Sequence, residues 1–285
     1  MFRRMSAPVV RRGATRTMQY GLMSIAFVAY LLPIFWIILT SFNHDYNSTA
    51  YPPKLFQVPE WTLKNYTKAF GSTGGMQLNF RNSVVISSLS SVLAMIIGTP
   101  AAYALSRYKF RGNGSIYLSF MASRIAPATL IALPIFVWSR RLALFDTIEL
   151  MVIVNAMTSL AWVVWMMRSF FDDVAVEIDE AAMIDGCSRL SCLTRIIIPM
   201  SKPGLAATMI FCVISSWNEY FYTLVLTSVR AQNLPAALNS FISIYGLKWG
   251  EMCAAATVIM LPILLFVMFL QKYLIKGLTL GAVKG

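Results

Sequence analysis

The chain has 285 residues, of which 58% are hydrophobic and only 13% are charged, and its mean hydropathy is +0.64. Since soluble domains carry roughly 25% charged residues, this composition excludes an ordinary cytosolic globular protein, a disordered chain and a small disulfide scaffold. The 24 basic and 12 acidic residues give a formal charge of +12. In so apolar a chain, this excess indicates basic loops beside membrane spans, and no nucleic-acid partner is expected.

The first apolar run covers residues 20–41 and follows a basic segment with Arg3, Arg4, Arg11, Arg12 and Arg16. The core of a cleavable signal peptide has roughly 7–15 apolar residues, and this run is longer. It is long enough to cross a hydrocarbon layer of ~30 Å. The sequence therefore predicts a retained first span whose basic end lies in the cytoplasm.

Further apolar windows are each long enough for a membrane helix of roughly 20 residues. They cover residues 82–106, 114–139, 148–168, 203–226 and 253–275. The sequence thus predicts an all-α, polytopic membrane protein with six transmembrane helices in one domain over 1–285. Basic clusters follow the second and sixth spans, which places both termini in the cytoplasm, although Arg140 and Arg141 then lie outside and oppose the positive-inside rule.

Two long loops and a tail separate or follow these spans. Residues 42–80 are rich in Pro and Gly and form the expected external loop. Residues 276–285 form a cytoplasmic tail. Residues 169–202 form a cytoplasmic loop that holds half of all the acids: Asp172, Asp173, Glu177, Asp179, Glu180 and Asp185.

The acidic loop predicts two short helices at an angle. Residues 174–184 are helix formers, and Gly186 then permits a backbone reversal that a residue with a Cβ resists. Ser188 is a suitable N-cap for a second helix that runs to about Ile197. Pro199 and Pro203 end that helix and lead into the fifth span. We expect these two helices to form a compact cytoplasmic knob.

The spacing within this loop is E-A-A, three residues, G, nine residues, I-x-[LI]-P. It resembles the cytoplasmic signature of the membrane subunits of bacterial ATP-binding-cassette (ABC) importers. The match covers Glu180, Ala181, Ala182, Gly186, Ile196 and Pro199, and Ile198 stands where the family usually has Leu. Asp146-Thr147, Trp217-Asn218-Glu219-Tyr220 and the tail 277–285 narrow the resemblance to the smaller permease of maltose- and trehalose-type importers.

The resemblance implies that the knob sits in a cleft of an ATPase subunit. Closure of two such subunits on ATP then draws the knobs together and rotates the spans. Glu180 is the implied contact to a basic residue of the ATPase, Ala181 and Ala182 permit close approach, and Gly186 forms the turn. The expected coupling residues are Glu180, Ala181, Ala182, Asp185, Gly186, Ile196 and Pro199.

The same resemblance implies the assembly. The expected partners are a second, homologous permease in a heterodimer, two ATPase subunits, an external or periplasmic sugar-binding protein and membrane lipid. The chain itself is expected in the bacterial inner (plasma) membrane as a multi-pass protein.

The sequence lacks a G-x-x-x-x-G-K-[ST] phosphate-binding loop. We therefore expect a non-catalytic subunit that binds no cofactor, with ATP and Mg held by the partner ATPase. The four cysteines and His44 fit no zinc pattern, so no metal site and no catalytic residue are expected.

Polar residues inside spans are costly and tend to face the bundle interior, where they mark a solute path. Helical spacing places Asn155, Thr158, Ser159 and Trp162 on one face of the fourth span, and Ser215, Asn218, Glu219 and Tyr222 on one face of the fifth. Arg124 lies in the third span and is a candidate partner for Glu219. The candidate path residues are Asn155, Trp162, Trp217, Asn218, Glu219, Tyr220 and Arg124, of which the aromatic ones offer flat faces to a sugar ring.

The alternative for these residues is hydrogen bonding between helices, worth ~0.6 kcal/mol per bond on average. The favoured function is the permease of an ATP-driven carbohydrate importer. Other classes stay open: a similar permease for amino acids, peptides or phosphate, a passive channel, and a membrane-embedded enzyme. The enzyme lacks a reactive constellation, and the channel leaves the knob without a purpose.

Overall fold

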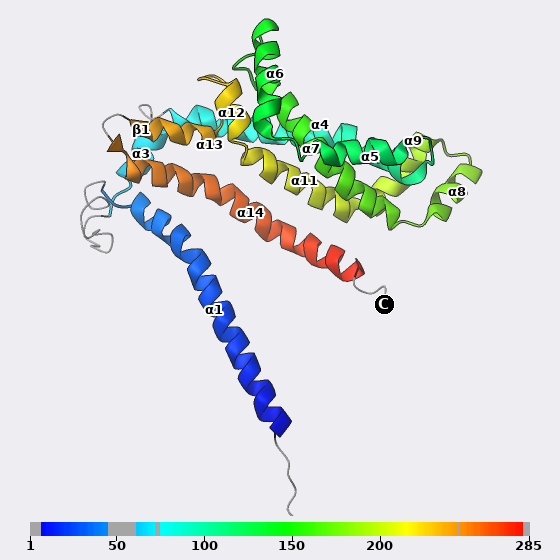
Figure 1. Cartoon of the computed structure of the whole chain (residues 1–285), viewed down its shortest axis with the longest axis horizontal. Coiled ribbons are helices and arrows are strands. Elements are labelled where there is room, and N and C mark those ends of the chain that lie inside the picture. Colours follow the sequence, from blue (N-terminus) through cyan, green and yellow to red (C-terminus); the bar gives the residue numbers. More distant parts are fainter. Residues whose placement is uncertain (1–6, 45–60, 72–74, 244–245, 282–285) are drawn as a thin grey trace, which may run out of the picture. The chain divides into compact units, whose positions relative to one another are not determined.

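The computed structural model describes residues 7–44, 61–71, 75–243 and 246–281 (Figure 1). Most of them are helical. The elements are α1 (Ala7–Ser41), α3 (Lys64–Phe70), α4 (Met76–Arg107), α5 (Asn113–Ala122), α6 (Ala128–Arg141), α7 (Ile148–Asp172), α8 (Val176–Ile184), α9 (Arg189–Cys192), the π-helix η2 (Leu193–Ile197), α10 (Ile198–Met200), α11 (Lys202–Trp217), α12 (Phe221–Leu226), α13 (Leu234–Ala237), the 3₁₀-helix η3 (Leu238–Phe241), β1 (Ile242–Ser243), β2 (Gly246–Leu247) and α14 (Trp249–Gly281).

Four described helices are long and apolar enough to cross a membrane: Met18–Ser41, Met76–Arg107, Ile148–Asp172 and Trp249–Met268. They correspond to the first, second, fourth and sixth predicted spans. A fifth candidate is the pair Arg189–Met200 and Lys202–Trp217, bent by 84° at its junction. The chain is therefore a helical, multi-pass protein, and the full count of six spans stays a prediction.

The third and fifth predicted windows are not continuous helices, and this corrects the sequence interpretation. Residues 114–139 form α5 and α6 with a break at 123–127, and residues 203–226 form α11 and α12 with a break at 218–220. Pro127 precedes α6 directly, in the extended backbone typical of proline at a helix start. Hydropathy alone does not register such breaks, because the break residues are flanked by long apolar stretches.

The chain divides into two compact units: Met1–Ala69 with Phe241–Thr257, and Phe70–Ser240 with Val258–Gly285. In the second unit, α4 packs against α7, and α11 packs against both (Figure 1). Small residues allow the close approach. A Cβ on Gly98 of α4 would lie only 2.6 Å from Cγ1 of Val163 on α7. Close packing of small residues is a main source of helix association in lipid.

The buried residues of this unit include a cluster that joins the long helices to the predicted knob. Ala102 and Tyr103 of α4 and Met167 and Phe171 of α7 are buried together with residues of α8 and η2, among them Ala182, Leu193 and Ile197. The knob is thus continuous with the packed core of the helices that carry it.

Asp146 fixes a loop of the second unit from a strained backbone position with φ of 61°. Its carboxylate accepts hydrogen bonds from the backbone N–H groups of residues 228–231, at 2.9 to 3.1 Å. Asp tolerates the left-handed region better than most residues. Thr147, the next residue, caps α7 by accepting from Leu150 N at 3.3 Å.

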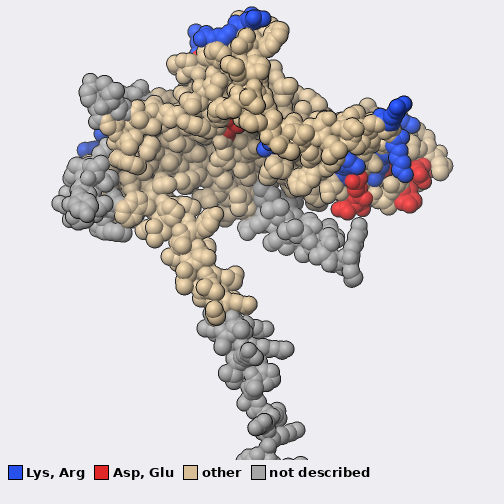
Figure 2. All heavy atoms as spheres, in the orientation of Figure 1, with Lys and Arg blue, Asp and Glu red and all other residues tan. Residues whose placement is uncertain are grey.

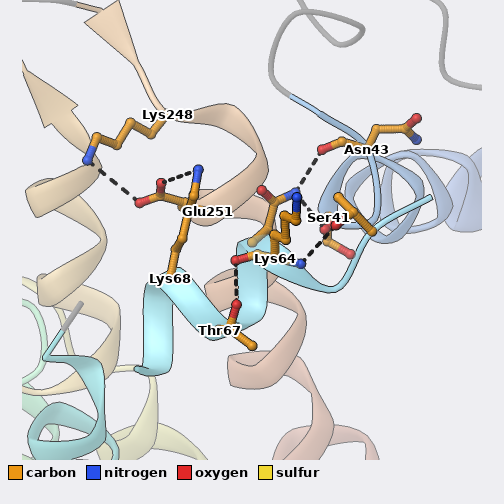
Figure 3. Close-up of polar contacts among 9 residues, drawn as sticks. Ser41, Asn43, Lys64, Thr67, Lys68, Lys248 and Glu251 are labelled. Atoms are coloured by element: carbon orange, nitrogen blue, oxygen red, sulfur yellow. Dashed lines mark hydrogen bonds and ion pairs between the residues drawn. The ribbon is translucent and has the colours of Figure 1, made fainter. Parts of the chain in front are cut away.

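The first unit holds the polar cluster of Figure 3. Asn65 on α3 donates to the backbone oxygens of Ser41 and Asn43 at 2.9 and 2.7 Å, which ties α3 to the end of α1. Glu251 lies between Lys68 and Lys248, at 3.9 and 3.7 Å. Part of the predicted external loop 42–80 lies outside the described residues, at 45–60 and 72–74, as do residues 282–285 of the predicted tail.

Candidate functional site

The knob begins with α8 and turns at Gly186. Gly186 has φ of 87°, its N–H donates to Met183 O at 3.1 Å, and the N–H of Cys187 donates to Ala182 O at 3.0 Å. This pair of bonds is a Schellman C-cap, which needs a left-handed residue at the position of Gly186. The reversal expected at this glycine is therefore present.

The second arm of the knob is short and irregular. Ser188 caps α9 by accepting from Ser191 N at 3.3 Å, as predicted. The helix then widens into the π-helix η2 and continues through α10 to the bend before α11. The sequence predicts that this helix ends before Pro199, but Pro199 lies within α10 and the helix continues to Met200, interrupted by η2.

The residues of the E-A-A spacing divide into exposed and buried sets. Glu180, Ala181 and Asp185 are exposed, and Gly186 and Pro199 are exposed as well. Ala182 is buried against the second arm, Ile196 is half-buried, and Ile197 beside it is fully buried. One side of α8 thus packs inward and the other remains accessible.

Apolar side chains accompany the exposed acids. Ile184 is 86% exposed and Leu190 68% exposed, and Val176 and Met183 are exposed too. Figure 2 shows acidic and basic side chains together over α8 and α9, while the surface over the long helices carries few charges. The knob therefore presents a mixed surface of apolar and charged side chains.

The root of the knob is held by Asp179, a residue that the sequence analysis did not single out. Its Oδ2 pairs with Nε of Arg107 at 2.8 Å, and both side chains are only 4% exposed. Its Oδ1 accepts hydrogen bonds from the hydroxyl of Tyr103 and from Sγ of Cys192, the latter at 3.4 Å. Arg107 also donates to Val174 O at 2.9 Å. One carboxylate therefore joins α4, α8 and α9.

The sequence contains a signal that Asp179 is buried, but none that names its partner. Asp179 lies three residues before Ala182, so both lie on the inward side of α8, and an acid at such a position needs a buried cation. Arg107 is the last residue of α4. The sequence places both residues near the cytoplasmic loop but gives no reason to pair them with each other.

A cavity of about 530 Å³ lies where the two broken helices meet. Its lining comes from the break 123–127 and α6, from α7, and from both sides of the break 218–220, and it includes Arg124, Thr158, Ser215, Glu219 and Tyr222. Contacts between α6 and α12 and between α7 and α12 hold these segments together. Two charged side chains from separate breaks thus face one hollow.

Arg124 is fixed from one side of the cavity. Its Nη1 donates to Thr158 O at 3.1 Å, and its guanidinium lies over the ring of Trp162, 4.9 Å from the centroid. Trp162 itself packs edge-on against Phe211. Trp162 therefore supports Arg124 from outside the cavity lining.

Glu219 is fixed from the other side. Its Oε1 accepts from Tyr222 N at 2.7 Å, across the break between α11 and α12. Its backbone oxygen accepts from Nδ2 of Asn233. Arg124 is the candidate partner of Glu219 from the sequence, but among the described residues no ion pair joins them.

The other predicted path residues lie outside the cavity lining. Asn155 is buried and donates back to Met151 O at 2.8 Å, and Trp217 is buried with Nε1 donating to Ile259 O at 3.2 Å. Asn218 donates to Ile214 O at 2.9 Å, and Tyr220 bonds Asn239. In the described part of the chain, no group of three or more His, Cys, Asp or Glu side chains is placed to hold a metal ion.

These features define a class: a helical membrane subunit with a cavity between interrupted helices and a polar knob joined to their core. The family described as "Binding-protein-dependent transport system inner membrane component" matches residues 90–280. The chain belongs to this family, and the resemblance drawn from the spacing over 180–199 is confirmed at the family level.

Two individual proteins are similar to this chain over most of its length. A probable ABC transporter permease protein, y4oR, of Sinorhizobium fredii is 36% identical over 260 residues, covering 91% of this chain and 92% of that protein. The trehalose/maltose transport system permease protein MalG of Thermococcus litoralis is 31% identical over 258 residues, covering 90% and 92%.

A solved structure has the same fold. It is the crystal structure of a bacterial ABC transporter involved in the import of the acidic polysaccharide alginate. One of its chains superposes with a TM-score of 0.75 at 24% identity, over 95% of this chain and 99% of that chain.

Proposed function

We propose that this chain is one permease subunit of an ATP-driven importer for a carbohydrate, and that a separate ATPase drives it through the knob. Family membership supports the transport role. The similarity to a trehalose/maltose permease supports a sugar as the cargo. A sugar, a sugar derivative and a polyol all fall within this proposal.

The observation that carries the coupling role is the Asp179–Arg107 pair at the root of the knob. Glu180 is the next residue, and it is exposed beside the apolar side chains of Met183 and Ile184. A load applied to this surface passes through Asp179 to the end of α4, which packs along α7. The knob and the spans then move together instead of the knob bending alone.

The absence of a phosphate-binding loop from the sequence assigns ATP and Mg to the partner. The proposed assembly has two ATPase subunits, a second homologous permease and an external or periplasmic sugar-binding protein. This chain contributes no catalytic residue, and its coupling residues are those of the spacing from Glu180 to Pro199. We propose that both termini lie in the cytoplasm of a bacterial cell.

A charge reversal tests the coupling role. Glu180→Lys places a cation where the proposed ATPase cleft offers one, so ATP-dependent uptake and co-purification of the ATPase are expected to fall sharply with normal membrane insertion. Glu177→Lys is the matched control, because Glu177 is also an exposed acid of α8. It lies outside the spacing and is expected to retain uptake. Unchanged uptake in Glu180→Lys contradicts the proposal.

Two further assays separate the alternatives. A passive channel carries solute without ATP, so uptake into proteoliposomes of the assembled complex is measured with and without ATP. A permease for amino acids, peptides or phosphate is recognised when the associated binding protein is stabilised by those solutes and by no sugar.

A further inference from the structure

The cavity between the two helix breaks is lined by one cation and one anion that are not in ion-pair contact. Arg124 comes from the break between α5 and α6, and Glu219 from the break between α11 and α12. Each is oriented by its own neighbours, Thr158 and Trp162 for the arginine and Tyr222 N for the glutamate. Among the described residues, no ion pair joins the two side chains.

Both side chains retain hydrogen-bonding capacity beyond these contacts. A guanidinium has five N–H donors, and the only hydrogen bond of Arg124 in the described structure is the one to Thr158 O. A carboxylate has about four lone-pair sites. Glu219 lines the cavity, and its hydrogen bond from Tyr222 N is made to Oε1. The volume of about 530 Å³ falls within the range of about 300–1,000 Å³ typical of small-molecule sites.

The charges select between classes of sugar. Hydroxyl groups both donate and accept, so a neutral ring satisfies a guanidinium and a carboxylate at the same time. A sugar that carries a carboxylate is drawn to Arg124 but meets the like charge of Glu219 in the same hollow, and like charges in one site are penalised.

We propose that this cavity binds a neutral, polyhydroxylated ring of the transported solute between Arg124 and Glu219, and that Glu219 discriminates against sugars bearing a carboxylate. The inference rests on the proposed function, because it names the solute class of a carbohydrate permease. The proposed neutral solute differs from the cargo named for the structurally similar alginate transporter, which is an acidic polysaccharide.

The test measures equilibrium binding of labelled sugars to the whole transporter complex, purified through a tag on this chain. The probes are maltose, trehalose and cellobiose, each compared with a disaccharide in which one ring is a hexuronate. The wild-type complex is expected to bind at least one neutral probe about tenfold more tightly than its uronate counterpart, the effect of one interaction with a charged group.

Two variants separate the role of the anion Glu219 from that of the cation Arg124. Glu219→Gln keeps an oxygen acceptor for Tyr222 N while it removes the charge, so the preference for the neutral probe is expected to fall about tenfold through a gain in uronate binding. Arg124→Gln is expected to weaken the neutral probe about tenfold with no gain for the uronate. A structural role for either residue predicts equal changes for both probes.

Glu149→Gln is the matched control, because Glu149 is exposed at the start of α7 and does not line the cavity. Its binding ratio is expected to equal that of the wild type. No binding of any neutral probe, equal binding of both classes, or an unchanged ratio in Glu219→Gln each overturns the inference. ATP-dependent uptake by the wild type is measured in parallel, and its absence contradicts the proposed function instead.

Discussion

Arg107 and Asp179 lie 72 positions apart in the sequence, yet Nε and Oδ2 are 2.8 Å apart and both side chains are 4% exposed. The pair joins the last residue of α4 to the middle of α8. Removing two charges from water is costly, and their mutual attraction offsets that cost only with good geometry and further hydrogen bonds. Tyr103, Cys192 and the carbonyl of Val174 supply those bonds.

Breaking the Arg107–Asp179 pair is expected to destabilise the protein strongly. Asp179→Leu leaves the guanidinium of Arg107 buried without its carboxylate, and the free energy of unfolding is expected to fall by about 3–5 kcal/mol. The double variant with Arg107→Met is expected to lose less than the sum of the two single changes. Unfolding in detergent, analysed as a double-mutant cycle, measures the difference.

Glu177→Leu is the control for that cycle, because Glu177 is exposed on the same helix. Its change is expected to lie within about 0.5 kcal/mol of zero. Strictly additive losses for Asp179→Leu and Arg107→Met would show that the two side chains are not coupled.

The turn at Gly186 gives a second prediction. A Cβ at this position meets no other atom within 4 Å, so the cost of Gly186→Ala comes from the left-handed backbone alone. The free energy of unfolding is expected to fall by about 1–2 kcal/mol. Gly186→Asn is expected to lose less, since Asn tolerates this region. Gly114→Ala serves as control in α5, where the added Cβ also meets open space.

The crossing of α4 and α7 gives a third prediction. In Gly98→Ala, the new Cβ would lie 2.6 Å from Cγ1 and 2.8 Å from Cβ of Val163, a stiff and fully buried side chain. Overpacking of this kind is expected to lower the free energy of unfolding by about 1–3 kcal/mol. Adding Val163→Ala removes Cγ1 and with it the shorter of the two contacts, while Cβ remains, so the double variant is expected to lose less than the sum of the single changes.

The control for this crossing is Gly21→Ala in α1, where a Cβ meets nothing within 4 Å. It is expected to leave the thermal midpoint unchanged or slightly raised, because Ala is the better helix former. A Gly98→Ala protein as stable as the wild type would mean that the two helices separate easily at this point.

Asp146 gives a prediction on pH. Burial acts to raise the pKa of this carboxyl, but hydrogen bonds from the backbone N–H groups of Ser228, Arg230, Ala231 and Val229 outweigh it, and the pKa lies below its usual range. Its contribution to stability is therefore complete above the unfolded pKa of about 3.9. It is lost as the pH falls through the lower pKa of the folded state.

Hydrogen exchange of the amides at 228–231 reports this loss. In the wild type, their protection is expected to fall when the pH decreases from about 5 to below the unfolded pKa of about 3.9. In Asp146→Asn, protection is expected to be lower than in the wild type above the unfolded pKa and to lose this dependence, because the side chain no longer carries a titrating charge. The same pH dependence in both proteins would assign it to another group.

The sequence predicted the features that depend on neighbouring residues. Apolar runs located four helices long enough to span a membrane, because burial in lipid requires an uninterrupted apolar stretch. Gly186 and Ser188 predicted the turn and the cap within the knob, since both depend on local backbone geometry. The spacing over 180–199 predicted the family, which the match over 90–280 confirms.

Tertiary structure decided which distant residues meet. Nothing local pairs Asp179 with Arg107, because that pairing depends on how α8 packs against α4. The breaks at 123–127 and 218–220 lie inside apolar stretches, so hydropathy predicted continuous helices there. Only the packing of α6, α7 and α12 brings Arg124 and Glu219 to one cavity, while it buries Asn155 and Trp217 elsewhere. Local sequence determined the long apolar helices, the turn and the cap, but the side chains that face a common cavity depend on contacts between segments far apart in the chain.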